Sequence, residues 1–204
     1  MRPRFKRIAI FAYDGMDEGD FTGVYGPLAK AAQSPEGREL LALSVFALDD
    51  TVRTSGGLVI GFALPPVRDL QSEDILVLPG GSAARSKAPA DAAAVEIKKF
   101  WALERPVYAI CSGVFLLAHL GLLNGRRAAV HHNHRAELER IAGCRTAEGL
   151  TRDGMLTTIG GIQFNPGTKA TRTAYEILET FFPSLLELVA DRMEVPASTS
   201  SAAS

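Results

Sequence analysis

Short, continuously apolar runs recur along this chain, and they alternate with longer segments that have the hydrophobic period of a helix. A strand that is apolar throughout must be covered on both faces, which is typical of parallel sheets in α/β proteins. The runs predicted as strands are Ile8–Tyr13, Leu41–Leu48, Ile75–Leu78 and Val107–Ile110, and the predicted helices are Phe21–Gln33, Ala90–Leu103, which starts at Ala90 or Asp91, and Ser112–Leu120. The pattern predicts an α/β fold with a doubly wound, mainly parallel sheet and helices on both faces.

The rest of the chain adds smaller elements to this frame. They are a hairpin at Val52–Phe62, a tight turn at Arg152-Asp153-Gly154 between two more strands, and helices at Thr168–Phe182 and Leu185–Met193. Residues 1–196 are expected to form a single domain. The small, polar residues 197–204 are expected to be an unstructured tail.

Charge and cysteine content narrow the class of partner. The 22 basic and 23 acidic side chains give a formal net charge of -1, so no electrostatic footprint for nucleic acid or anionic lipid is present. The apolar run after the basic N-terminus ends at Asp14, too early for a signal peptide, and no segment reaches membrane-spanning length. Two distant cysteines make no disulfide framework. We therefore expect a cytoplasmic protein whose partner is a small molecule, with no nucleic acid and no membrane.

Cys111 lies where a predicted strand passes directly into a predicted helix. Such an elbow pushes a nucleophile into the cleft above the carboxyl edge of the sheet, and Gly113 lets the helix pass close to the neighbouring strand. The partial positive charge of the helix N-terminus favours the thiolate, which predicts a lowered thiol pKa and a reactive Cys111. The alternative is a buried structural cysteine, the role that we assign to Cys144.

A second turn follows the strand Ile75–Leu78 at the same edge of the sheet. It contains Gly80 and Gly81, which permit close approach of the backbone. The backbone amides of Gly81 and Ser112 can point together at an oxyanion that forms on an atom attacked by Cys111. The alternative is an ordinary turn between a strand and a helix, since paired glycines are common in turns.

Both turns contain sequence motifs that can be compared with known families: Leu78-Pro79-Gly80-Gly81 and Ala109-Ile110-Cys111-Ser112-Gly113. Further matches are Asp20-Phe21-Thr22-Gly23, Ser55-Gly56-Gly57, Leu116-Leu117-Ala118, Gly121 to Ala128, and Val130-His131. Over most of its length the chain thus resembles the DJ-1/PfpI superfamily, which is class I glutamine amidotransferase-like. Within it, the residues around the cysteine are most similar to the isocyanide hydratase branch and to the sensor domains of AraC-type regulators. The resemblance implies a flavodoxin-like fold with Cys111 on a nucleophile elbow.

The resemblance also implies the site residues. Catalytic roles fall to Cys111, Asp20 and His131, and oxyanion or substrate binding falls to Gly80, Gly81, Ser112 and Gly113. Burial and the nearby sulfur would raise the pKa of Asp20, so that its neutral carboxyl can donate a hydrogen bond to the thiolate and carry protons. The alternative for Asp20 is a helix N-cap. His131 would be an acid–base group or part of the pocket lining.

The neighbouring histidines do not complete a metal site. His132 and His134 are interpreted as surface or capping residues because no cysteine or acidic cluster accompanies them. His119, inside the helix after the elbow, is interpreted as a packing or interface residue. We expect no metal and no cofactor.

Two departures from the superfamily bear on activity. Peptidase-like members carry histidine directly after the nucleophile, where this chain has Ser112, and isocyanide hydratases usually carry threonine there. The segment from Gly160 to Thr168 also differs from the usual approach to the late helix. Peptidase activity loses support, and the shape of the pocket is left open.

The expected function is that of a cysteine-dependent hydratase or hydrolase acting on a small electrophile. Conversion of an isocyanide to an N-formamide is the first candidate reaction. A glyoxalase-like reaction on α-oxoaldehydes is the nearest alternative. A sensor module that binds a metabolite or registers oxidation is an alternative from another class. Because residues 196–204 cannot supply a helix-turn-helix, a DNA-binding regulator is disfavoured. The resemblance also implies a homodimer, because members of the superfamily are commonly dimers.

Overall fold

A central sheet organises the computed structural model, which describes residues 5–161 and 168–197. Its strand order is β2-β1-β5-β6-β10-β9, and every neighbouring pair is parallel except β10 and β9. The strands are β1 (Lys6–Ala12), β2 (Leu41–Ala47), β5 (Ile75–Leu78), β6 (Val107–Ile110), β9 (Gly149–Asp153) and β10 (Leu156–Gly160). The five parallel strands have the order 2-1-3-4-5 of a flavodoxin-like fold, which confirms the predicted fold class.

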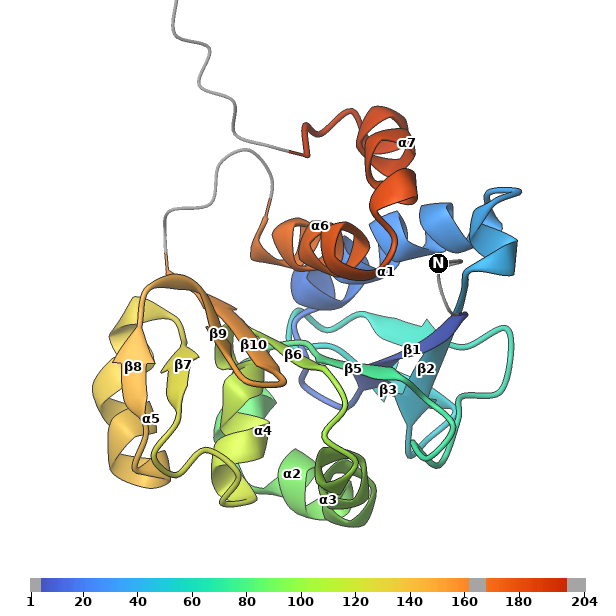
Figure 1. Cartoon of the computed structure of the whole chain (residues 1–204). Helices are drawn as coiled ribbons and strands as arrows, with labels where there is room; N and C mark the ends of the chain where they lie inside the picture. The colour runs from blue at the N-terminus through green and yellow to red at the C-terminus, as the bar shows by residue number, and fades with distance from the viewer. Residues whose placement is uncertain (1–4, 162–167, 198–204) are drawn as a thin grey trace, which may run out of the picture.

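Helices cover both faces of the sheet (Figure 1). On one face α1 packs against α6 and α7, and on the other α2 packs against α3 and α4. Their bounds are α1 (Glu18–Gln33), α6 (Lys169–Phe181) and α7 (Pro183–Met193) on the first face, and α2 (Ala88–Ala92), α3 (Ala94–Ala102) and α4 (Val114–His119) on the second. The chain leaves β1 toward one face and β5 toward the other, so the switch point of the topology lies between these two neighbouring strands.

Burial explains why the apolar runs form the central strands. Every residue of β5 and β6 is buried, and both strands have the bounds predicted from the sequence. With both faces covered there is no polar alternation, so the continuous apolar run was the correct signal. The strand β1 starts at Lys6 and ends at Ala12, a small shift from the predicted Ile8–Tyr13.

The predicted helix Ala90–Leu103 is wrong as one element. It is two helices, which meet at Ala93, and the first begins at Ala88 rather than at Ala90 or Asp91. Pro89 therefore lies in the first turn, where a missing backbone N–H costs no hydrogen bond.

Several short elements complete the described chain. The predicted accessory hairpin is β3 (Thr51–Arg53) with β4 (Val59–Gly61), and the predicted turn between β9 and β10 has Gly154 at φ +61°. A small unit of β7 (Arg127–Ala129), α5 (Arg135–Ala142) and β8 (Arg145–Ala147) was not predicted. One-turn 3-10 helices are η1 (Gly37–Glu39), η2 (Ser82–Arg85), η3 (Cys111–Gly113) and η4 (His132–His134).

Two sequence predictions concern residues that the structure does not describe. The segment Gly160–Thr168 has residues 162–167 outside the described range, and the proposed tail has residues 198–204 outside it. In the described ranges, 5–161 and 168–197, no helix has the length and apolar character needed to cross a bilayer.

Candidate functional site

Three turns meet at the carboxyl edge of the sheet. The first joins β1 to α1 and carries Asp20, the second follows β5 and carries Gly80 and Gly81, and the third joins β6 to α4 and carries Cys111. They border a cleft of about 490 Å³, whose lining includes Cys111, Asp20 and Gly81. The fold thus brings the predicted nucleophile, its acidic partner and the glycine turn to one place.

Cys111 occupies a strained elbow. Its φ of +54° lies in the left-handed region that residues with a side chain avoid. Two residues later, Gly113 passes so close to the neighbouring strand that a Cβ there would lie 2.2 Å from the carbonyl oxygen of Leu78. The predicted close approach at Gly113 is confirmed, and it fixes the position of the turn that carries the thiol.

Asp20 points into the protein and does not cap its helix. The N-cap of α1 is Asp17, whose Oδ1 accepts the backbone N–H of Asp20 at 2.8 Å. Asp20 is only 8% exposed, and its Oδ2 accepts the backbone N–H of Gly80 at 3.1 Å. The alternative that Asp20 is an N-cap is therefore wrong, and its side chain is free for the cleft.

Gly80 separates Asp20 from the elbow. A Cβ at this position would lie 2.6 Å from Oδ2 of Asp20 and 3.0 Å from both the carbonyl oxygen of Ile110 and Oγ of Ser112. Any side chain here would push the acid away from the elbow. The glycine is needed because of this close approach rather than because of its φ.

Burial controls the ionisation of Asp20. Removal from water raises the pKa of its carboxyl to about 6, and the negative charge of Asp17 acts in the same direction. The positive charge of Lys169 and the hydrogen bond from Gly80 lower this pKa, but they offset only part of the rise.

The lowered pKa predicted for Cys111 is wrong in direction. Burial raises the pKa of the thiol, and the nearby charge of Asp20 raises it further. A hydrogen bond from the backbone of Ser112 and the charge of Lys169 oppose this rise without reversing it. The elbow continues as one 3-10 turn, Cys111–Gly113, followed by six α-helical residues.

The hydroxyl of Ser112 ties the two predicted oxyanion turns together. Its Oγ accepts the backbone N–H of Gly81 at 2.9 Å and donates to the carbonyl oxygen of Gly81, also at 2.9 Å. Gly81 has φ +139°. Its amide is therefore occupied in this arrangement, and it becomes available to an oxyanion only when the Ser112 hydroxyl turns away. The sequence did not indicate this clamp.

The histidines are arranged differently from the prediction. His134 lines the cleft, whereas His131 does not. The Nδ1 atom of His131 accepts the backbone N–H of Asn133 at 3.3 Å, and its ring stacks on His132 with centroids 4.3 Å apart. Burial and then the charge of His132 lower the pKa of His131, which keeps its ring neutral at pH 7. Sequence reasoning placed His134 at the surface and so missed its position.

Two cations at the cleft were also missed. Arg85, in η2, pairs with Glu137 at 3.0 Å, and Lys169 begins α6. No local pattern marks either residue, because each enters the cleft on an element remote from Cys111 in the sequence. His119, which the sequence analysis interpreted as a packing or interface residue, forms a hydrogen bond through its Nε2 with the carbonyl oxygen of Arg85 at 2.9 Å. Among the described residues, no group of three or more potential metal-ligating side chains is present.

Two curated proteins are similar to this chain in sequence. A protein of Streptomyces lividans, described as an uncharacterized protein in the cpoL 5' region, is 30% identical over 135 residues, which is 66% of this chain and 93% of that protein. The isonitrile hydratase of Pseudomonas putida is also 30% identical, but over 89 residues, which is 44% of this chain and 39% of the hydratase.

Solved structures share the fold. A ThiJ/PfpI family protein from Pseudomonas syringae has a TM-score of 0.74 at 22% identity, covering 98% of this chain and 79% of that one. An AraC family transcriptional regulator from Pseudomonas putida has a TM-score of 0.73 at 18% identity, covering 92% and 98%. The DJ-1/PfpI family matches residues 6–165, a range that contains all three turns of the cleft. With the elbow, the glycine turn and the inward-facing acid in place, this chain belongs to the DJ-1/PfpI family.

Proposed function

We propose that this protein is a cysteine-dependent hydratase or hydrolase of a small electrophile, and that an isocyanide is its first candidate substrate. The observation that carries the proposal is the buried carboxyl of Asp20, held by Gly80 beside the elbow, with a pKa raised to about 6. A carboxyl with such a pKa can both accept and return a proton near neutral pH. The similarity to an isonitrile hydratase supports the choice of substrate.

The two titratable groups act as one unit. Each has a raised pKa, and the charge of Asp20 is among the causes for Cys111. At neutral pH the pair therefore keeps one proton, with the carboxyl ionised and the sulfur as a thiol. In this state Asp20 is a general base that activates the thiol during attack, rather than a neutral partner of a preformed thiolate.

In the first step a bond forms between Sγ of Cys111 and the terminal carbon of the isocyanide. Asp20 takes the thiol proton and delivers it to that carbon, which gives a thioimidate on Cys111. Proton and charge balance within the pair, and no oxidant or reductant is needed. The raised pKa of Asp20 makes its carboxylate a stronger base toward the thiol proton, and a carboxyl with a pKa of about 6 is still acidic enough to pass that proton to the carbon.

In the second step water adds to the thioimidate carbon. One proton of the water goes to the imidate nitrogen, the carbon–sulfur bond breaks, and the other proton returns to the pair. The product is the N-formamide, which is the isocyanide plus one water. The backbone N–H of Ser112 and the positive charge of Lys169 stabilise negative charge at the sulfur as it leaves.

Turnover of p-nitrophenyl isocyanide tests this proposal, with formamide as the measured product and methylglyoxal assayed in parallel. Cys111→Ala should abolish formamide production, and Asp20→Asn should lower it by about 10²–10⁴-fold, as expected for loss of an acid–base group. Cys144→Ala is the matched control and should retain full activity, since Cys144 is buried away from the cleft. Cys111-dependent consumption of methylglyoxal alone would replace the hydratase proposal with a glyoxalase.

A sensor is the second candidate, supported by the shared fold of an AraC family regulator. The raised pKa of Cys111 favours metabolite binding over oxidation as the sensed signal, because oxidation needs the thiolate. It requires no turnover of either compound, together with saturable metabolite binding or selective oxidation of Cys111. In either case we propose a single domain over 1–196, a homodimer and a cytoplasmic location. Light scattering on the purified chain of 21.8 kDa tests the homodimer directly.

A further inference from the structure

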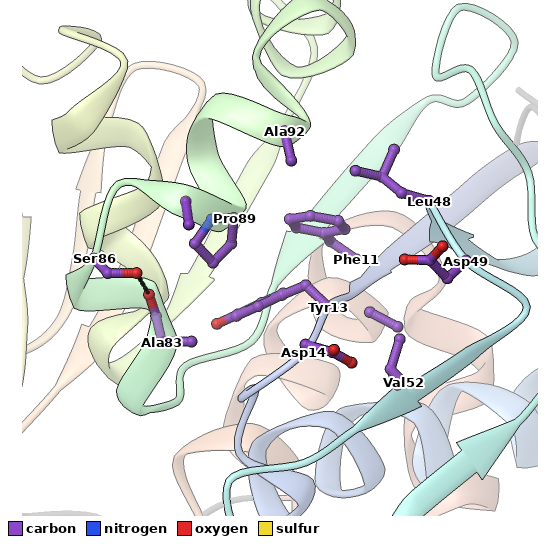
Figure 2. Close-up of a pocket in the computed structure, with 12 residues that line it drawn as sticks. Phe11, Tyr13, Asp14, Leu48, Asp49, Val52, Ala83, Ser86, Pro89 and Ala92 are labelled. Atoms are coloured by element: carbon purple, nitrogen blue, oxygen red, sulfur yellow. Dashed lines mark hydrogen bonds between the residues drawn. The ribbon is translucent and has the colours of Figure 1, made fainter.

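Tyr13 is a buried, titratable side chain that the proposed reaction does not use. It follows the last residue of β1 and is only 6% exposed. Its ring lines a hollow that is separate from the Cys111 cleft (Figure 2), and the lining of the cleft does not include it. An effect of Tyr13 on chemistry at Cys111 must therefore pass through another group.

The hydroxyl of Tyr13 holds two consecutive carbonyl groups of the glycine turn. It donates toward the carbonyl oxygens of Pro79 and Gly80, each at 2.9 Å, so that one proton serves two acceptors. The ring packs on Phe11 with centroids 4.9 Å apart, which limits its rotation. Burial, and then the negative charge of Asp20, raise the pKa of Tyr13 well above its usual value, so the hydroxyl keeps its proton near pH 7.

The two carbonyl groups belong to peptide groups whose N–H groups bind side chains of the cleft. The first shares its peptide group with the N–H of Gly80, which donates to Oδ2 of Asp20 at 3.1 Å. The second shares the next peptide group with the N–H of Gly81, which donates to Oγ of Ser112 at 2.9 Å. A peptide group that accepts a hydrogen bond at its oxygen is polarised and donates more strongly at its nitrogen. Tyr13 therefore acts on Asp20 and on Ser112 through one peptide group each.

The first of these peptide groups depends on Tyr13 more than the second does. In the described part of the chain, the buried Pro79 has no other donor to its carbonyl oxygen. The carbonyl oxygen of Gly80 has a second donor, the backbone N–H of Asp17 at 2.8 Å. Loss of the hydroxyl therefore leaves the oxygen of Pro79 unpaired, and the peptide group that binds Asp20 becomes free to turn.

We propose that Tyr13 is a positioning residue: it holds the peptide group between Pro79 and Gly80 so that the N–H of Gly80 stays directed at the carboxylate of Asp20. The assignment rests on the proposed function, because that function makes Asp20 the base of the reaction. The contacts that carry it do not depend on turnover.

Loss of the phenol oxygen should raise the pKa of Asp20. The hydrogen bond from Gly80 lowers this pKa, because it stabilises the charged form of the carboxyl. The other groups that act on this carboxyl are Asp17 on its own helix, Cys111 on the elbow and Lys169 at the start of α6. None of these is removed with the phenol oxygen, so a change in the titration of Asp20 reports the turn.

Carbon-13 NMR of labelled aspartate carboxyls tests the proposal without turnover. The background is Cys111→Ala, which removes the coupled thiol, and Asp20→Asn identifies the signal. On this background Tyr13→Phe should raise the titration midpoint of Asp20 by about one unit, as weakening of a hydrogen bond to a carboxylate does. Tyr175→Phe is the matched control, since it also removes a hydroxyl that donates to a backbone carbonyl, that of Val195 at 2.7 Å. It should leave the midpoint unchanged.

The pH profile of turnover gives a second readout. A general base acts only when it is ionised, so Tyr13→Phe should lower kcat/KM for p-nitrophenyl isocyanide by about fivefold at pH 6 but by less than about twofold at pH 8. KM should change little, because Tyr13 does not line the cleft. If no isocyanide is turned over, the hydratase proposal fails, whereas the carboxyl titration still decides the role of Tyr13.

Replacing Tyr13 by 3-fluorotyrosine separates hydrogen bonding from packing, and it keeps the proposal testable if Tyr13→Phe does not fold. Fluorine makes the phenol a stronger donor, so the midpoint of Asp20 should fall rather than rise. An unchanged midpoint in Tyr13→Phe, an equal rise in Tyr175→Phe, or a rise with 3-fluorotyrosine would each overturn the proposal.

Discussion

The carboxyl of Asp20 and the thiol of Cys111 lie in one partly closed site, and the protein stabilises neither charge fully. Burial is the largest cause of the raised pKa in both groups. A thiol with a raised pKa is a poor nucleophile by itself, so its reactivity depends on the base beside it. At the scale of single residues, the pair rather than the cysteine is the functional unit.

Replacing Asp20 should make the thiol more acidic. Asp20→Asn removes a negative charge that raises the pKa of Cys111, so the thiolate fraction near neutral pH should rise, by about tenfold for each unit of pKa. Brief iodoacetamide treatment across pH 6–10, followed by peptide mapping, measures this change. Labelling of the buried Cys144 serves as the internal control. Slower labelling of Cys111 in the variant would show instead that a protonated Asp20 holds the thiolate.

The same substitution should stabilise the fold at neutral pH. A carboxyl whose pKa rises from 3.8 to about 6 on folding favours the native state below pH 4, and this contribution is lost as the pH rises through 6. The loss corresponds to about 3 kcal/mol. Urea unfolding should therefore show Asp20→Asn to be more stable than the unaltered protein at pH 8, with a much smaller difference at pH 4. An equal difference at both pH values would contradict the buried, raised carboxyl.

At the scale of elements, the elbow depends on how closely β5 and the start of α4 approach. Gly113→Ala would place a methyl group 2.2 Å from the carbonyl oxygen of Leu78 and 2.7 Å from that of Pro79, both of them backbone atoms. We expect a loss of about 3 kcal/mol or more in the free energy of unfolding. Gly26→Ala, where a new Cβ meets nothing within 4 Å, should change stability by less than about 1 kcal/mol. Similar losses in both variants would argue against the close approach.

The sequence was sufficient for the elements whose signal is local. The strands β5 and β6 were predicted with their observed bounds because continuous burial leaves a continuous apolar run. The position of Cys111 followed from the passage of a strand directly into a helix. The strands β7 and β8 have three residues each, which is too few for a periodic signal, and as a parallel pair they lack the short glycine turn that revealed the equally short hairpin β3–β4.

The pKa values of Asp20 and Cys111 could not be predicted from local sequence signals. Asp17 and Asp20 are both acids at the start of α1, and Asp20 is positioned by a turn 60 residues away. Lys169 comes from α6, far along the chain from both groups that it affects. Burial of the thiol is likewise a tertiary effect, so the helix argument alone gave the wrong direction for its pKa.

At the scale of the whole molecule, Tyr13 connects the Cys111 cleft to a second hollow at the carboxyl edge of the sheet. The ring of Tyr13 lines this second hollow, as Figure 2 shows, together with Leu48 and Pro89. Its hydroxyl donates to the carbonyl oxygen of Gly80, and the backbone N–H of Gly80 donates to Asp20 in the cleft. A change at Tyr13 is therefore expected to reach the carboxyl of Asp20 through the glycine turn.

Time-resolved intact-mass spectrometry of the full chain mixed with p-nitrophenyl isocyanide tests the central claim most directly. We predict a transient gain of one isocyanide mass, located on Cys111 by peptide mapping, that decays as the formamide appears. The adduct should be absent in Cys111→Ala and unchanged in Cys144→Ala. Formamide production by Cys111→Ala, or an adduct on Cys144 alone, would contradict a mechanism in which Cys111 is the nucleophile.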